Sequence, residues 1–397
     1  MERYTGTTSR GIRTPIIRNG DDLCQIVVDS VIRASENENF QLHDRDVIAI
    51  TESIVARAEG NYVSCDDIAY DIQRHYPEGE IGLIFPILSR NRFSLILKGI
   101  ARGAKKITLL LSYPNDEVGN PLVSLEQLDE VGINPLSDIL TESRFKQLFG
   151  EYKHPYTGIN YLNFYREIIE AEKCQAEIIL ANDPRAILNY TRDILVCDIH
   201  NRERSRKVLE NCSDGLVYGL SDILAEPIQN SGYNEQYGLL GSNKASEETL
   251  KLFPRTGHEL VEDIAKLFKE KTGKEVEVMV YGDGAFKDPV GRIWELADPV
   301  VSPAYTEGLG GVPHEVKIKY LADYTFSELS GEELEEQIRS AIRAKADDGD
   351  KSSMSSEGTT PRRIVDLLGS LADLTSGSGD KGTPVVLIQG YFDSLAE

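Results

Sequence analysis

The centre of the chain contains short apolar runs that alternate with amphipathic segments, and this pattern limits the fold more than any other feature. The runs at residues 107–111, 176–180 and 194–197 are rich in branched side chains and are bounded by turn residues. Runs of this length and composition are typical of strands buried on both faces of a parallel sheet. We therefore predict an α/β layer structure for the centre of the chain.

The same alternation of helix and strand continues on both sides of this central part. The pattern predicts three further pairs of a helix and a following strand, at residues 22–32 and 46–50, 259–271 and 275–281, and 361–374 and 384–389. Gly273 supplies the expected stop for the second helix. The fold class that follows is α/β, of mixed α+β character, with a large central α/β insertion in the core.

Length and charge limit the organisation and the partners of the chain. A chain of 397 residues with 40% hydrophobic composition is too large for one small domain, so we expect two or three lobes. The net charge of -22 repels phosphate backbones and anionic lipids, so we expect no nucleic acid and no membrane partner. The sequence has neither an apolar run of the ~20 residues that span a bilayer nor the order of a secretory signal. We therefore expect a cytoplasmic protein.

A loop rich in glycine and serine follows the last predicted helix. Its candidate phosphate-binding residues are Ser376, Gly377, Ser378, Gly379, Lys381 and Gly382. Glycines allow backbone N–H groups to approach an anion, and the lysine adds a point charge. The loop is not a Walker motif, because a helix precedes it and a strand follows it. The alternative interpretation is a plain flexible connection.

A carboxylate flanked by glycines, Asp283, follows the predicted strand at 275–281. The ends of strands in α/β sheets commonly carry ligand groups, and hard oxygen ligands suit Mg²⁺ or Mn²⁺. Asp288 and Glu295 could complete the coordination shell. The alternative is a turn in which Asp283 binds its own backbone.

Two further polar segments carry candidate residues. Arg57, at the end of a predicted strand and helical turn, could clamp phosphate or carboxylate, although a surface cluster with Glu59 explains it as well. Asn243 could contact a nucleotide or a metal ion. We favour the alternative that residues 241–248 cap a short helix that begins near Glu247.

Taken in order, four segments of the chain resemble the coenzyme F420-0:gamma-glutamyl ligase family. They are residues 13–23, 46–60, 282–284 and 376–386. The resemblance implies a two-lobed α/β protein that forms a homodimer and binds GTP and two divalent cations. It also implies an enzyme that adds L-glutamate to a deazaflavin cofactor precursor.

The resemblance assigns roles to individual residues of this sequence. The guanine nucleotide would be lined by Thr14, Pro15, Ile16 and Ile17, and its phosphates would lie near Glu52, Ser53 and Arg57. The metal ligands would be Asp283, Asn243 and Asp288, and the loop from Ser376 to Gly382 would close over the site. The catalytic residues would be Arg57, Asp283 and Lys381.

The chain departs from the family pattern at three positions. Arg57 replaces a lysine, residues 241–244 lack a metal-binding aspartate, and Gly284 replaces a threonine. The resemblance covers about half of the chain. It leads us to expect a ligase core at residues 1–78, 213–345 and 361–397, a central insertion at 79–212 and a flexible connection at 346–360.

The expected activity is a nucleotide-dependent amide-bond ligation. GTP or ATP would act as cosubstrate with Mg²⁺ or Mn²⁺, and with K⁺ as an optional further ion. L-Glutamate would be joined to a small carboxylate acceptor through an acyl phosphate. Three alternatives stay open, namely a ligase for another acceptor such as a folate-like pterin, a non-catalytic nucleotide-binding regulator, and a structural α/β protein without a site.

Overall fold

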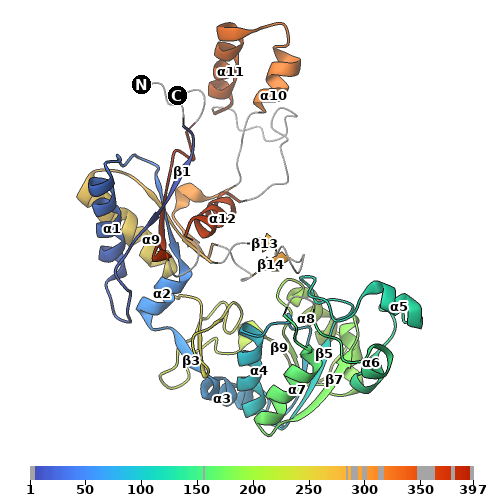
Figure 1. The fold of residues 1–397 in the computed structure, drawn as a ribbon. Coiled ribbons are helices and arrows are strands. Elements are labelled where there is room, and N and C mark those ends of the chain that lie inside the picture. Colours follow the sequence, from blue (N-terminus) through green and yellow to red (C-terminus); the bar gives the residue numbers. More distant parts are fainter. Residues whose placement is uncertain are drawn as a thin grey trace.

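Two separate sheets, each covered by helices, make up most of the structure (Figure 1). The computed structural model describes residues 5–154, 157–282, 285–287, 294–296, 302–311, 317–346, 363–376 and 381–393. In this part of the chain, no helix is long and apolar enough to cross a membrane. The mixed α/β character predicted from the sequence is confirmed.

The first sheet has five strands drawn from both ends of the chain and from its second half. In spatial order they are β1 (Thr8–Ile12), β16 (Val385–Gln389), β2 (Val47–Thr51), β12 (Glu277–Tyr281) and β15 (Ala304–Tyr305). Strands β2 and β12 are parallel, whereas β16 is antiparallel to both β1 and β2. Strands β1, β2 and β12 therefore all point in the same direction.

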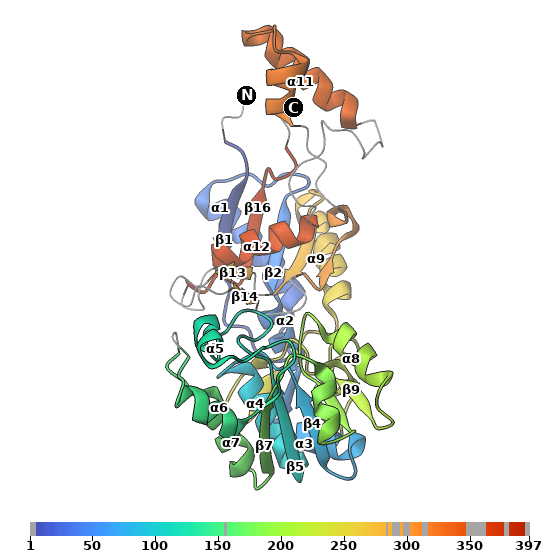
Figure 2. The same ribbon diagram turned by 90° about the vertical axis from the view of Figure 1, so that its right-hand side faces the viewer.

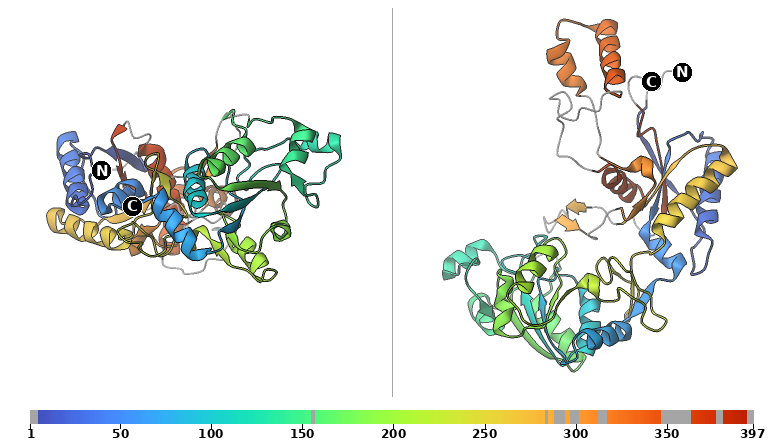
Figure 3. Two further views of the ribbon diagram at one scale, coloured as in Figure 1. Left: turned by 90° about the horizontal axis from the view of Figure 1, so that it is seen from below. Right: turned by 180° about the vertical axis from the view of Figure 1, so that it is seen from behind.

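Both faces of the five-stranded sheet are buried. Its helices are α1 (Leu23–Glu38), α9 (Gly257–Thr272) and α12 (Ile364–Ser376). Ile48 and Ile50 of β2 pack toward α1 and α9, while Val47 and Ala49 pack toward α12. Figure 3 shows α1 and α9 beside each other on one face, and Figure 2 shows α12 on the other. Burial on two faces explains why β2, β12 and β16 are continuous apolar runs rather than alternating ones.

The second sheet has six strands and contains the three central runs predicted as buried strands. In spatial order they are β6 (Leu140–Thr141), β7 (Gln175–Leu180), β5 (Lys106–Leu111), β4 (Glu80–Ile84), β8 (Ile194–Val196) and β9 (Val217–Gly219). All neighbours are parallel except β6 and β7. After β4 the chain first adds β5, β6 and β7 on one side of this strand. It then adds β8 and β9 on the other side, as in doubly wound folds.

Helices surround the second sheet, and short elements connect it with the first. The surrounding helices are α3 (Cys65–His75), α4 (Arg92–Gly103), α5 (Leu125–Val131), α6 (Glu142–Phe149), α7 (Tyr161–Ala171) and α8 (Arg202–Glu210). The connecting elements are α2 (Glu52–Glu59) and a three-stranded sheet of β10 (Asn243–Lys244), β11 (Thr249–Lys251) and β3 (Tyr62–Ser64). The remaining elements are β13 (Ala285–Lys287), β14 (Trp294–Leu296), α10 (Ile318–Tyr320), α11 (Gly331–Ala346), a π turn at Leu321–Thr325, and 3₁₀ turns at Pro184–Asn189, Leu220–Asp222 and Glu307–Leu309. The domain limits drawn from the sequence stay a prediction.

The structure corrects two local predictions. The helix favoured near Glu247 does not form, because β10 and β11 make a hairpin in which the Ser246 and Thr249 hydroxyls lie 2.6 Å apart and β11 also pairs with β3. The loop predicted from residue 375 begins later. Helix α12 continues to Ser376, and the hydroxyls of Thr375 and Ser376 donate to the Leu371 and Asp373 carbonyls, at 2.7 and 3.1 Å.

Asp198, directly after β8, is an unusual buried carboxylate. Its side chain is 2% exposed, Ser205 Oγ donates to Oδ2 at 2.7 Å, and Oδ1 has no hydrogen-bond partner among the described residues. Burial raises the pKa of Asp198 to about 6. At pH values between the ordinary pKa of an aspartate and 6, Asp198 keeps its proton in the folded chain and releases it in the unfolded chain. The contribution of this group to stability is therefore complete below about pH 4 and is lost as the pH rises through 6.

We predict that Asp198→Asn increases the free energy of unfolding by about 3 kcal/mol at pH 8 and leaves it nearly unchanged at pH 4. Urea unfolding at both pH values measures the difference. Asp214→Asn is the control, since Asp214 is exposed and Arg192 lowers its pKa, so it should give no gain at pH 8. A pH-independent effect of Asp198→Asn would contradict this account.

Candidate active site at one edge of the five-stranded sheet

One edge of the five-stranded sheet gathers the ends of four strands. Strands β1, β2 and β12 finish there, and the antiparallel β16 begins there. In the register, Ile12 lies opposite Val385 and Tyr281 lies opposite Thr51, while the Thr51 amide donates to the Pro384 carbonyl at 3.0 Å. The carboxyl ends of parallel strands commonly carry ligand groups. This edge is therefore the candidate active site.

The four segments that the sequence singled out meet at this edge. The segment after β1 contains Thr14, the segment after β2 contains Glu52, Gly282 follows β12, and residues 381–384 precede β16. Tyr281 and Pro384 are two strand positions apart, a separation of about 10 Å. Segments that are far apart in the sequence are thus close enough to contact one small ligand.

Residues 13–20 are held against the end of α2. The Gly20 amide donates to the Ala58 carbonyl at 2.8 Å. Gly60, which ends α2, has a φ of +67°, and a side chain there would bring its Cβ within 2.6 Å of Asn19 Oδ1. Only glycine combines this backbone conformation with such a close approach. The contact packs residues 58–60, at the end of α2, against the segment that follows β1.

The residues proposed to line the nucleotide differ in their exposure. Thr14 is half-buried and donates to the Pro15 carbonyl at 2.9 Å, while Pro15 is exposed and Ile16 is 78% exposed. Ile17 points instead into the core beneath α1 and α9. Ile16 can therefore contact a bound molecule directly, whereas Ile17 supports the segment from below.

Helix α2 presents its candidate residues at different depths. Glu52 begins the helix and is 4% exposed, and Ser53 is half-buried beside it. Arg57 lies in the last turn and is exposed. The predicted surface cluster of Arg57 with Glu59 does not form. Glu59 instead accepts hydrogen bonds from the Arg255 and Thr256 amides at 2.9 and 3.0 Å.

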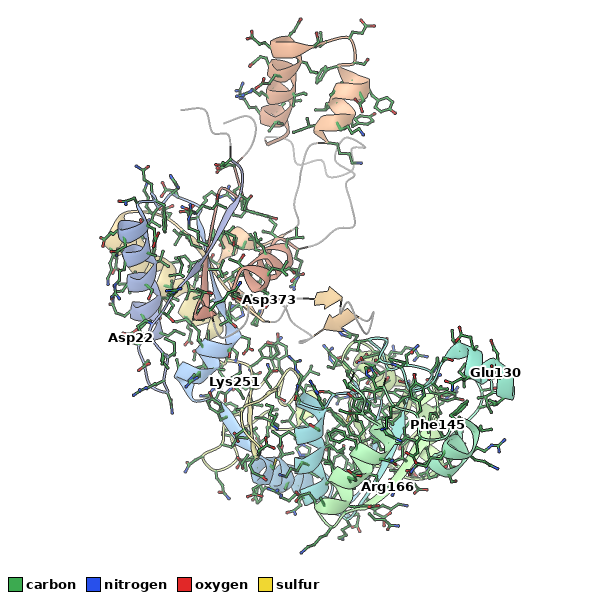
Figure 4. All side chains as sticks on the ribbon, viewed as in Figure 1. Asp22, Glu130, Phe145, Arg166, Lys251 and Asp373 are labelled. Atoms are coloured by element: carbon green, nitrogen blue, oxygen red, sulfur yellow. The ribbon has the colours of Figure 1, made fainter. Side chains whose placement is uncertain are left out.

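Glu52 forms a buried ion pair with Lys251 of β11. The Nζ to Oε1 distance is 3.3 Å, and the two side chains are only 10% and 5% exposed. Figure 4 shows Lys251 beside α2, at the junction of the two parts of the molecule. Sequence reasoning missed Lys251. The signal was present, however, because this lysine interrupts the apolar run 250–253, and a charge in such a run needs a partner.

Lys251 also brings Asn243 to the same place, because the two residues are opposite each other in the pairing of β10 with β11. Asn243 is half-buried. The neighbouring Ser242 hydroxyl is buried and has no hydrogen-bond partner among the described residues. The 241–244 segment is therefore near the sheet edge, as the resemblance implies, but it contributes neutral oxygens rather than a carboxylate.

The glycine-serine loop is closed at its base. Thr383 Oγ1 donates to the Ser376 carbonyl at 3.0 Å, and the Ser9 and Thr375 hydroxyls lie 2.7 Å apart. Lys381 and Gly382 are exposed at the end of the loop. The two ends of the loop are thus joined to each other, and its first end is also joined to β1.

Several candidate residues lie outside the described part of the chain. They are Asp283, Asp288, Gly377, Ser378 and Gly379. Among the described residues, no group of three or more His, Cys, Asp or Glu side chains could hold a metal ion. The assignment of Asp283 and Asp288 as metal ligands stays a prediction, and Gly282, the chain neighbour of Asp283, lies at the sheet edge.

Two hollows border the five-stranded sheet. One of about 250 Å³ lies between the loop 233–237 and the start of α9, and it includes Arg255 and His258. The other, of about 790 Å³, lies between β1 and α1 and includes Arg10, Arg13 and Arg33. Only the first is adjacent to the carboxyl end of β12, because it is lined by Ala304, the partner of Val280.

Comparison with known proteins identifies the family. The sequence model of a family described as F420-0:Gamma-glutamyl ligase matches residues 11–390, which is nearly the whole chain. No curated protein shows a significant match. The family match includes the central six-stranded sheet as well as all four segments at the sheet edge.

The Glu52–Lys251 pair allows a direct test of the junction. We predict that Lys251→Met lowers the free energy of unfolding by about 3 kcal/mol, because the Glu52 carboxylate stays buried without its cation. In the double variant Glu52→Gln, Lys251→Met the loss should be about 1 kcal/mol or less, since neither charge remains. Urea unfolding measures both. Equal losses in the single and double variants would show that the pair is not coupled.

Proposed function

The chain belongs to the F420-0:gamma-glutamyl ligase family, and we propose that it is a GTP-dependent ligase that joins L-glutamate to a carboxylate acceptor. The observation that carries the proposal is the convergence of four separate segments on one edge of the five-stranded sheet. The family supports the ligation and the glutamate. The sheet edge supports a shared site for a nucleotide and a carboxylate.

The proposed reaction has two steps. A carboxylate oxygen of the acceptor attacks the γ-phosphorus of GTP, the bond to the β-phosphate oxygen breaks, and GDP leaves. The glutamate amine then attacks the acyl carbon of the acyl phosphate. Phosphate leaves with the bonding electrons, and the amine loses a proton. The phosphate is needed because a free carboxylate oxygen is a poor leaving group.

The residues at the sheet edge suit the demands of the first step. Phosphoryl transfer depends mainly on alignment and on neutralising charge. Lys381 at the base of the loop and Arg57 in the last turn of α2 are exposed cations that could approach the phosphates. The backbone amides of the glycine-serine loop would add neutral donors.

The acidic residues that follow β12 in the sequence suit a hard divalent cation. Asp283 would hold Mg²⁺ or Mn²⁺, with Asn243 and Asp288 as further oxygen ligands. A cation there would neutralise the charge of the bound phosphates. Glu52 is already paired with Lys251, so its charge is largely compensated within the protein.

The ligase proposal is tested with the full chain, GTP, Mg²⁺, L-glutamate and an extract of small metabolites. We expect a product heavier than its acceptor by one glutamate residue, formed together with GDP and phosphate. Asp283→Asn should lower the rate by roughly 100-fold or more, because the metal loses its carboxylate ligand.

Asp263→Asn serves as the matched control, since Asp263 is exposed on α9, and it should keep the wild-type rate. GTP binding without any product in the wild type would instead favour the non-catalytic regulator. Unchanged ligation by Asp283→Asn would remove the metal assignment.

A further inference from the structure

The smaller hollow beside the sheet edge has no role in the first step of the proposed reaction. It has a volume of about 250 Å³ and lies where the loop 233–237, the start of α9 and the start of β15 meet. Gly257 and Ala304 form part of its wall, and a Cβ on Gly257 would lie 3.1 Å from Ala304 Cβ and 4.0 Å from Val280 Cγ2. Val280 is one residue before Tyr281, the last residue of β12, whose partner in β2 is Thr51 at the candidate site. The hollow is therefore adjacent to the candidate reaction centre.

The wall formed by residues 233–237 is held rigidly by two buried asparagines. Asn234 Oδ1 accepts from the Gln236 and Tyr237 amides at 3.0 and 2.8 Å, and its Nδ2 donates to the Phe253 and Pro254 carbonyls. Asn61 accepts from the Tyr233 amide and donates to the Tyr233 carbonyl, both at 3.0 Å. The shape of the hollow is thus fixed before any ligand arrives, which lowers the entropic cost of binding.

One side of the hollow carries the Arg255 guanidinium, whose Nε lies 4.0 Å from Glu59 Oε2. The Arg255 guanidinium is stacked over the Tyr233 ring at 4.6 Å from its centroid, and this contact fixes its direction. His258 lies in the first turn of α9, a helix of 16 residues whose N-cap Thr256 makes no side-chain cap. The Glu59 carboxylate accepts hydrogen bonds from the Arg255 and Thr256 amides at the start of this helix, so Arg255 is the cation that this wall offers to a ligand.

An exposed carboxylate, Glu235, also lines the hollow. A carboxylate and a guanidinium on the walls of one small cavity complement a zwitterion, with the ammonium group near Glu235 and the carboxylates near Arg255 and His258. At about 250 Å³ the hollow is smaller than the roughly 300–1,000 Å³ of sites for larger ligands. A small amino acid therefore fits better than a nucleotide or a polycyclic acceptor.

We propose that this cavity binds the dicarboxylic amino acid L-glutamate and presents its amine to the reaction centre at the sheet edge. The inference rests on the proposed function for the identity of the ligand. It deepens that function by assigning Arg255 and Glu235 to the two ends of the amino acid. Neither residue was singled out by the sequence.

The test is direct binding of L-glutamate to the full chain, measured by calorimetry with Mg²⁺ and a non-hydrolysable GTP analogue present. Arg255→Met keeps the aliphatic stem over Tyr233 but removes the charge, and it should weaken binding by at least about tenfold. Arg255→Lys should recover part of the loss, because it restores the charge without the fork of donors. Arg33→Met, an exposed arginine in the larger hollow, is the control and should bind like the wild type.

Glutarate, which lacks the amine, separates the role of Glu235 from that of Arg255. The wild type should prefer L-glutamate over glutarate, and Glu235→Gln should lose most of this preference while keeping its affinity for glutarate. Thermal unfolding of each variant checks that it is folded. Wild-type binding by both Arg255→Met and Glu235→Gln would overturn the proposal, as would no binding of glutamate by the wild type.

The ligation assay separates this proposal from the proposed function. If the wild type forms the amide and Arg255→Met has an unchanged KM for glutamate, the cavity is not the glutamate site although the ligase assignment stands. If glutamate binds as described and no amide forms with any acceptor, the cavity assignment stands and the ligase assignment fails.

Discussion

Strands β1, β2 and β12 point in the same direction, because β2 pairs with β12 and the antiparallel β16 pairs with both β1 and β2. The rest of the structure depends on this constraint. Because β2, β12 and β16 are buried on two faces, a shift of register by one residue would exchange the side chains packed under α1 and α9 with those under α12. The register is therefore strongly specified. Its consequence is that strand ends from distant parts of the sequence meet at one edge, where they form the candidate site.

The Glu52–Lys251 pair links this edge to the rest of the molecule. Glu52 begins α2 at the end of β2, and Lys251 belongs to the three-stranded sheet that leads toward the six-stranded one. The same small sheet positions Asn243, and the chain that follows it continues through Arg255 into α9. The proposed metal, nucleotide and glutamate positions thus share one group of connected elements, so a change at the junction should affect all of them.

Local pattern was sufficient to predict the strands and helices whose apolar runs are long, such as β5, β7, β12 and α9. It was insufficient at residues 241–248, where pairing with β3 outweighs the capping preference of Ser246, and at Ser376, where α12 continues beyond the predicted helix end. The sequence order of four segments indicated a shared site, and the sheet register now places them together. Lys251 and the cavity around Arg255 were not predicted, because both depend on contacts between residues distant in sequence.

The central claim is that one edge of the five-stranded sheet binds the nucleotide, and hydrogen exchange with mass spectrometry tests it most directly. The full chain would be compared with and without a non-hydrolysable GTP analogue and Mn²⁺. We expect slower exchange in residues 13–20, 51–60 and 381–385, which surround that edge, and little change in the strands of the six-stranded sheet. Protection confined to residues 80–219, with none at the edge of the five-stranded sheet, would contradict the account.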